Sequence, residues 1–490
     1  MELPNGEKVL AAYAEGPEAV VTLVGELVTV VVALAAGVEA LEATVEALRS
    51  QLAKDSHNSH KPPSSDGPGK KPSPPRQASE RKPGGQRGHE GNTLHFSEAP
   101  DRVEPVPSAE TCVGCGAALA EAATGGEERR QVFDLPALCL EVVEYRGQTK
   151  ACPCCGRRNS ALFPPQAPAA VQYGPRIKAL GVYLMDYQLL PYERTAELLG
   201  DVFGMAPSEG TLHTAAQDCA AELQPVEEEI KQGVQQAAVA HFDETGLRVE
   251  NKRGWLHVAC TTALTFYAYH TRRGKVATDE IGILPGFDGR AIHDGLTSYP
   301  QYGCAHGLCN AHHLRELTFV EEQFDQDWAA QMKGLLLDAK ASVEEAKGLG
   351  WSALPEGDVA EIERRYQAIL DEGFAANAAP EVAAGEPKKR GRKKQSKAKN
   401  MLDRLEKHRF EVLAFVYDCR VPFDNNLAER DLRMAKVQQK ISGCFRTVEG
   451  ANTFCRIRGY ISTVRKQGGA VLAALEGAVR GRPLHPARGS

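Results

Sequence analysis

The stretch AAVAHFDETGLRV (residues 237–249) decides the fold, and three further runs follow it: GWLHVACT (254–261), LTFYAYH (264–270) and GRAIHDGLTSY (289–299). Short apolar and aromatic runs bounded by turn residues are typical of β-strands. The first three runs are joined by brief turns at 250–254 and 262–263, which predicts a meander of three strands. A helical segment around 275–284 precedes the fourth run. This order predicts a mixed α/β core.

Two aspartates lie at informative places in these runs. We expect Asp243 to end the first strand and Asp294 to end the fourth. An Asp there is costly unless it meets water, a cation or a donor. If the two strands are neighbours, the carboxylates converge and repel each other unless a divalent cation neutralises them, and Mg²⁺ prefers oxygen ligands. The outline is that of a ribonuclease H type of core with a Mg²⁺ site.

A third acid comes from PFDNNLAERDLRMAKVQQKISG (422–443), where Asp424 or Asn425 can cap a helix. Glu429 lies off the apolar stripe of that helix, which consists of Leu427, Met434, Val437 and Ile441. Its face also carries three basic residues, Arg433, Lys436 and Lys440. Glu429 can therefore hold a metal beside bound phosphate, or form an i,i+4 ion pair with Arg433 on a solvated face. Spacing alone favours the ion pair.

The cysteines predict a second kind of metal site. The chain has 13 cysteines, an odd number that fits a reducing cytoplasm better than a disulfide framework. Two CxxC pairs, Cys112 with Cys115 and Cys152 with Cys155, supply the four thiolates of a structural Zn²⁺ site, and each is followed by a turn-forming glycine. Cys154 can compete as a ligand. The segment between the pairs (129–150) reads as strands, so we expect a zinc-binding β module over 101–168.

The N-terminal region predicts self-association. Nine apolar residues alternate spacings of three and four: Val24, Leu27, Val31, Leu34, Val38, Leu41, Val45, Leu48 and Leu52. Such a seam is typical of a coiled coil, here a homodimer, although one amphipathic helix packed on its own chain would show the same pattern. Glu26 and Glu39 interrupt the apolar run 19–41, so we do not expect a membrane span.

The composition divides the chain further. We expect a coiled coil (1–55), a flexible basic linker (56–100), the zinc module (101–168), a helical domain (169–235), the core in two parts (236–345 and 401–466) around a helical, basic insertion (346–400), and a C-terminal tail (467–490). YERTAELLGDVFGMAPSEGTLHTAAQ (192–217) outlines a helix-turn-helix, with a turn at Gly204 and a cap at Ser208. Two packed helices without a DNA contact would look alike.

Any nucleic-acid surface must be local, because the formal net charge of the chain is −6. The insertion contains PKKRGRKKQSKAK (387–399), and a second basic region follows Glu429. A solvated charge run is the alternative to a contact with the phosphate backbone. The residues expected to contact DNA are Arg315, Lys388, Lys389, Arg390, Arg392, Arg433, Lys436, Lys440 and Arg446.

From the linker onward the sequence resembles the insertion sequence 66 family of bacterial transposases. The matching blocks are HNSHKPPSSDG, the CxxC pairs around RRQVFDLP, SEGTL, HFDETG, HDGLTSY, CNAHHLREL, NNLAERDLR and SGCFRTVEGA. The resemblance implies a ribonuclease H-like core with a DDE triad, whose members fall on Asp243, Asp294 and Glu429. A departure from the family pattern is CPCC in the second knuckle.

The resemblance also implies an activity. With Mg²⁺ or Mn²⁺, a cytoplasmic transposase of this kind nicks DNA at the 3′ ends of its element and joins them to target DNA. Its partners would be double-stranded DNA and accessory proteins of the same element. The competing interpretations are a non-catalytic zinc and coiled-coil DNA-binding protein derived from a transposase, and a nuclease that cuts without joining.

Overall fold

The computed structural model describes residues 6–55, 57–59, 94–136, 138–164, 166–378 and 395–487. The chain forms two compact units, one from 1–73, 171–195 and 208–490, the other from 74–170 and 196–207. Most of the predicted linker lies outside the described residues, as do Lys388, Lys389, Arg390 and Arg392. Asn58, at the start of the predicted linker, is buried, and its side-chain amide donates to Glu322 at 3.1 Å.

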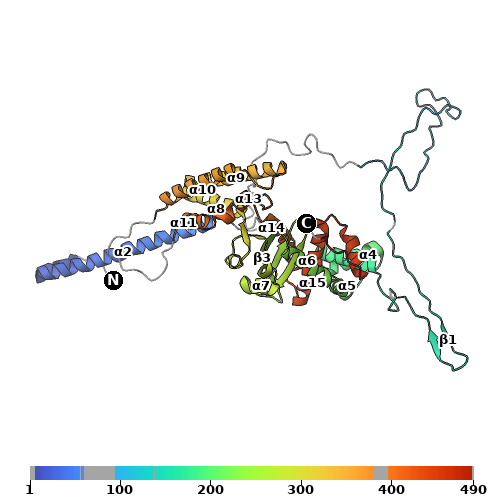
Figure 1. Ribbon diagram of the computed structural model, residues 1–490, viewed down its shortest axis with the longest axis horizontal. Helices are drawn as coiled ribbons and strands as arrows, with labels where there is room; N and C mark the ends of the chain where they lie inside the picture. The colour runs from blue at the N-terminus through green and yellow to red at the C-terminus, as the bar shows by residue number, and fades with distance from the viewer. Residues whose placement is uncertain are drawn as a thin grey trace. The chain divides into compact units, whose positions relative to one another are not determined.

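The first unit is built on a five-stranded mixed sheet of order β5-β4-β3-β6-β7. Its central strand, β3, is labelled in Figure 1. Its strands are β3 (Val239–Val249), β4 (Lys252–Cys260), β5 (Thr265–His270), β6 (Arg290–His293) and β7 (Ala305–Leu308). β3, β4 and β5 form the predicted antiparallel meander, and β6 and β7 run parallel to β3. Helix α7 (Lys275–Ile281) precedes β6, as predicted. The first hairpin turns at Glu250 and Asn251, both with positive φ, which suits a tight turn between twisted strands.

Two late helices, α14 (Asn426–Ser442) and α15 (Val448–Lys466), pack against this meander. Leu247, Leu256 and Val258 of the strands share one core cluster with residues of both helices. The buried stripe of α14 is Ala428, Leu432 and Ala435. The predicted stripe was therefore partly wrong: Leu427, Met434 and Val437 are only partly buried, and Ile441 is exposed. Small and branched side chains bring this helix close to the sheet, and the longer ones flank the contact.

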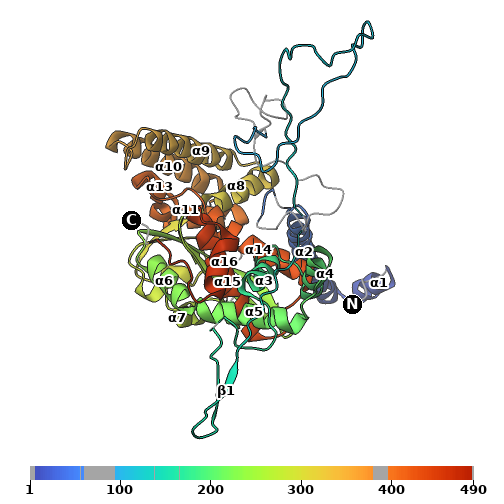
Figure 2. The same cartoon turned by 90° about the vertical axis from the view of Figure 1, so that its right-hand side faces the viewer.

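A helical subdomain follows β7. It comprises α8 (Asn310–Phe324), α9 (Asp327–Gly348), α10 (Glu356–Ala376), α11 (Lys397–Lys407), α12 (Arg409–Val412) and α13 (Ala414–Tyr417). Helices α9 and α10 lie side by side in both views (Figures 1 and 2). Trp328, Tyr366 and Phe415 are almost fully buried in its core. The insertion is helical as predicted, but its helices begin before residue 346.

The region before the sheet contains α3 (Pro175–Val182), the π-helix η2 (Tyr183–Tyr187), α4 (Tyr192–Phe203), α5 (Glu209–Glu222) and α6 (Gln224–Gln235). The turn at Gly204 (φ 71°) is present, and Ser208 caps α5 by accepting from the Thr211 amide at 3.1 Å. The predicted C-terminal tail contains a helix, α16 (Val471–Val479), which packs with α3 and α5. Leu475 of α16 is fully buried, so this segment is part of the folded unit and is not a free tail.

The N-terminal helices are α1 (Gly6–Glu15) and α2 (Pro17–Leu52). Most of the predicted seam is exposed on α2, including Val31, Leu34 and Leu41. By length and composition alone α2 is also apolar enough to cross a membrane. That is weak evidence for a span, because a single such helix near the N-terminus passes the same test for other reasons. Self-association through the seam stays a prediction.

The second unit contains the cysteine pairs. Its only strands among the described residues are β1 (Thr149–Ala151) and β2 (Arg158–Ser160), which pair as an antiparallel hairpin. The prediction of strands throughout 129–150 was therefore wrong. Val132, Leu135 and Val142 of that segment are largely exposed, so these apolar side chains do not pack in a core.

Candidate active site

Asp243 and Asp294 lie on neighbouring parallel strands. Val239 pairs with Arg290, Ala240 with Ala291 and His241 with Ile292. Continued by two residues, this register places Asp243 opposite Asp294, at the point where β6 ends. Asp243 lies in the middle of β3 and not at its end as predicted, because β3 continues into the hairpin with β4. Neighbouring strands are about 4.8 Å apart, so the two carboxylates are close.

Several negatively charged side chains lie near Asp243 and act on its carboxyl group. Burial is the main reason that the pKa of Asp243 lies well above its ordinary value, and the carboxylates of Asp294, Glu244 and Glu429 raise it further. The amide of Glu244, which donates to Asp243 at 2.8 Å, opposes the shift only in part. The third predicted acid therefore lies near enough to act on the first. A divalent cation would relieve this repulsion.

Asn425 connects the start of α14 to the sheet. The Oδ1 atom of this buried side chain accepts a hydrogen bond from His241 Nδ1 (2.8 Å), and its Nδ2 donates to the Phe242 carbonyl (2.9 Å) next to Asp243. Its backbone amide donates to Cys309 Sγ at 3.1 Å. Asn425 is the N-cap residue, but its side chain makes no capping bond within α14. It instead holds the first turn of the helix, and with it Glu429, over β3.

Two acids on α14 have opposite surroundings. Asp431 is paired with Lys466 at 2.8 Å and accepts from Thr265 at 3.0 Å, so its charge is used within the fold. Glu429 Oε1 is buried without a hydrogen bond, and its ion-pair partner is His312, whose Nε2 lies 3.6 Å away. The ion pair with Arg433 that spacing favoured does not form: Arg433 is exposed. A buried carboxylate oxygen that accepts no hydrogen bond, such as Glu429 Oε1, suits the role of a metal ligand.

A fourth carboxylate, Glu244, escaped the sequence analysis. It is buried beside Asp243, accepts from the Tyr299 hydroxyl at 2.5 Å and pairs with Arg273 at 2.8 Å. Tyr299 ends the loop that carries Asp294, so this bond ties that loop to β3. The sequence could have indicated Glu244, because it directly follows Asp243 in a predicted strand. Successive side chains of a strand point to opposite faces, so Glu244 needs partners on the other face of the sheet.

The predicted DNA contacts differ in accessibility. Arg433, Lys440 and Arg446 are exposed, and Arg315 is half-buried on α8. Lys436 donates to the Gly246 carbonyl, so its ammonium is engaged by β3 and is less available to phosphate than the exposed residues. Of the predicted contacts that the structure describes, Arg433, Lys440 and Arg446 are therefore the accessible cations.

The cysteine pairs form two matching turns. The amide of Cys112 donates to Ala117 and that of Cys152 to Arg157, each at 2.9 Å. Gly116 and Gly156 both have positive φ, as the predicted turns require. Hydrogen bonds from backbone amides at Cys115 and Cys155 lower the pKa of Cys112 and Cys152 respectively, which favours thiolates. Among the described residues, the four thiols are not gathered into one metal-binding group.

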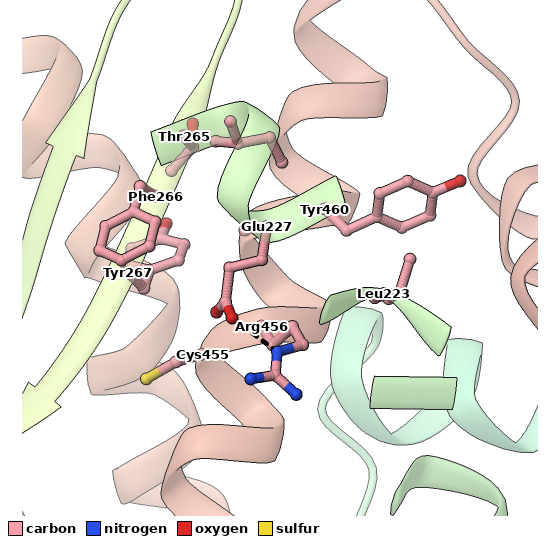
Figure 3. Close-up of a pocket in the computed structure, with 10 residues that line it drawn as sticks. Leu223, Glu227, Thr265, Phe266, Tyr267, Cys455, Arg456 and Tyr460 are labelled. Carbon is pink, nitrogen blue, oxygen red and sulfur yellow. Dashed lines mark hydrogen bonds and ion pairs between the residues drawn. The ribbon is translucent and has the colours of Figure 1, made fainter. Parts of the chain in front are cut away.

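A small cavity elsewhere in the first unit has a structural role. Residues of α6, β5 and α15 line it, and Figure 3 shows the Glu227 carboxylate meeting the Arg456 guanidinium there. The two groups are 2.6 Å apart and link α6 to α15. Both charges are therefore paired within the fold.

The first unit therefore carries a group of acids on a mixed sheet, and exposed cations lie on and after α14. The sequence matches the Transposase IS66 family over residues 170–453, more than half of the chain. The chain belongs to the IS66 family of transposases. Residues 11–95 match a family of unknown function, DUF6444. No curated protein matches the chain.

Proposed function

We propose that the chain is a DDE transposase with a ribonuclease H-like core, in which Asp243, Asp294 and Glu429 hold Mg²⁺ or Mn²⁺. The observation that carries the proposal is the register of β3 with β6, which places Asp243 opposite Asp294. Glu429 of α14 is close enough to raise the pKa of Asp243 as well. The order β5-β4-β3-β6-β7 supports the fold assignment. The family supports double-stranded DNA as the substrate.

The side chains suggest how the work is divided. Bound metal ions would activate the attacking oxygen and stabilise the leaving oxygen of the phosphodiester. Asp243 and Asp294 supply hard oxygen ligands from the sheet, and Glu429 supplies one from α14. Arg433, Lys440 and Arg446 would hold the phosphates on either side. No protein nucleophile is needed, because water attacks in nicking and a 3′-hydroxyl attacks in strand transfer.

A strand-transfer assay tests this function. Pre-cleaved duplexes from both ends of the DNA that flanks the gene are incubated with a target plasmid and Mg²⁺. Joined products support the transposase. Cleavage of uncut ends without joining would indicate a nuclease. DNA binding without either reaction would indicate a non-catalytic DNA-binding protein.

Divalent metal is expected to stabilise the fold, most strongly at neutral to alkaline pH. The folded-state pKa of Asp243 is raised, so its contribution to stability is fully present below the unfolded value of about 3.9 and is lost as the pH rises through the folded value. Mg²⁺ at about 100 times its Kd should restore about 2.7 kcal/mol. Thermal melts with EDTA or Mg²⁺ at pH 5.5 and 8 measure this. An equal Mg²⁺ effect on Asp243→Asn would contradict it.

We further propose that Cys112, Cys115, Cys152 and Cys155 bind structural Zn²⁺. Elemental analysis after dialysis should find about one zinc per chain. Cys112→Ser should lose that zinc, because three thiolates no longer close the tetrahedron. Cys139→Ser, which changes an exposed cysteine of the same unit, is the matched control. Zinc retained by Cys112→Ser would remove Cys112 from the site, and a parallel Cys154→Ser variant tests the competing ligand.

The exposed seam of α2 supports a homodimer. Deleting residues 1–55 should shift the protein towards monomer in sedimentation velocity, because the apolar a and d positions are removed. In the full chain, Leu34→Glu should act in the same way, whereas Glu26→Gln should leave the dimer intact. An unchanged oligomer after the deletion would place the self-association elsewhere.

A further inference from the structure

A second group of metal-binding side chains shares Glu429. Donor atoms of Cys309, His312 and Glu429 all lie within 4.8 Å of one another. Cys309 is the N-cap residue of α8 and His312 lies one turn later, where its amide donates to the Cys309 carbonyl at 3.1 Å. Glu429 approaches from the first turn of α14. The spacing of two donors is thus set by one helical turn, and Asn425 holds the third beside them.

The chemistry of this group differs from that of the acidic triad. A sulfur, an imidazole nitrogen and a carboxylate oxygen are the ligand types that Zn²⁺ accepts in tetrahedral sites. Mg²⁺ prefers oxygen alone. Bonds of about 2.0–2.3 Å place tetrahedral ligand atoms roughly 3.3–3.8 Å apart. The separation of 3.6 Å between His312 Nε2 and Glu429 Oε1 already fits that range.

The surroundings of Cys309 also suit a metal-bound thiolate. Its buried Sγ accepts a hydrogen bond from the Asn425 amide, which stabilises negative charge on sulfur. An ion bound to Cys309 would replace the thiol proton, so binding forms a metal–sulfur bond and releases that proton to water. Only a thiophilic ion gains enough from that bond.

We propose that Cys309, His312 and Glu429 form a regulatory site for a thiophilic ion such as Zn²⁺, which withdraws Glu429 from Asp243 and Asp294 and arrests the Mg²⁺-dependent reaction. One carboxylate serves two alternative sites, and the ion present decides which site holds it. The proposed arrest of the reaction depends on the proposed transposase function, whereas the proposed binding of the ion is independent of that function.

Co²⁺ titration of the full chain tests the site without any reaction. Thiolate ligation to Co²⁺ produces a charge-transfer band in the near ultraviolet. The band is expected in the wild-type chain, and the part of it due to Cys309 should vanish in Cys309→Ala. The buried and distant Cys219→Ala should keep it. His312→Gln removes a proposed direct ligand, so the apparent affinity for Co²⁺ should fall at least about tenfold. Loss of a hydrogen-bond partner of a metal ligand already has an effect of about that size.

A Co²⁺ band that Cys309→Ala and His312→Gln both leave unchanged would overturn the proposal. The same titration in Cys112→Ser separates this site from the cysteine pairs, because the Cys309-dependent part should persist there. Thermal melts of each variant show that it is folded.

The arrest is measured as strand cleavage at fixed Mg²⁺ and rising Zn²⁺, with each variant normalised to its own zinc-free rate. Cys309→Ala should need at least about ten times more Zn²⁺ for half-inhibition than the wild type or Cys219→Ala. Equal inhibition of all three would overturn the regulatory role. If the wild type does not cleave DNA at all, the proposed function fails while the Co²⁺ result still decides the site.

Discussion

Replacing Asp243 with Asn should reduce DNA strand cleavage by at least about a thousandfold, because the substitution removes a charged ligand of the proposed metal site. Asp294→Asn and Glu429→Gln should have effects of the same order. Binding to DNA should persist or strengthen, since each change removes negative charge beside phosphate. Single-turnover cleavage and filter binding on the same duplex measure the two properties.

The matched control for this series is Asp424→Asn. Asp424 precedes α14 and accepts from the Asn426 amide at 3.0 Å, a bond that the Asn side chain can also accept. It lies five residues before Glu429 and is not one of the three proposed metal ligands. Activity close to wild type is expected. Normal cleavage by any one of the three triad variants would remove that residue from the proposed site.

The second large effect is expected for Asn425→Leu. The substitution removes the side-chain bonds to His241 and to the Phe242 carbonyl and leaves both partners buried. Each unsatisfied buried group costs about 1–3 kcal/mol, so the loss of stability should be roughly 2–6 kcal/mol. Glu429 would also lose its anchor over β3. A misplacement of about 1 Å can reduce a rate a hundredfold.

A positioning role is separable from a purely structural one. Cleavage is measured at a temperature where Asn425→Leu is fully folded, over a range of Mg²⁺ concentrations. A higher Mg²⁺ requirement is expected, because the carboxylates must be drawn together by the ion. Asn426→Ala changes the exposed neighbour and should behave as wild type. Wild-type Mg²⁺ dependence in folded Asn425→Leu would show that this residue supports only stability.

The local pattern of the sequence predicted the sheet well. The apolar runs correspond to β3, β4, β5 and β6, and the helical segment between the last two is α7. Alternating burial and short turns are local properties, so they can be read from neighbouring residues. The same reasoning failed for 129–150, where an apolar pattern occurs without a partner to cover it. Strand formation depends on that partner.

The site depended more on contacts between distant segments. Spacing on α14 favoured an ion pair of Glu429 with Arg433, and only the packing of α14 on β3 places Glu429 near Asp243. The same packing joins Asp431 to Lys466, so two acids two residues apart have different uses. The roles of Glu244 and Asn425 were also invisible, because their partners Tyr299, Arg273 and His241 lie far along the chain.

By itself, the sequence determined four of the five strands of the sheet, the cysteine turns and, through its motifs, the family. These depend on local periodicity, on glycines with positive φ and on matching blocks of residues. Only the tertiary structure decided that Asp431 is neutralised within the fold and that Glu429 faces Cys309 and His312. Charge interactions act through space and fall off with distance, so the order of residues along the chain does not reveal them.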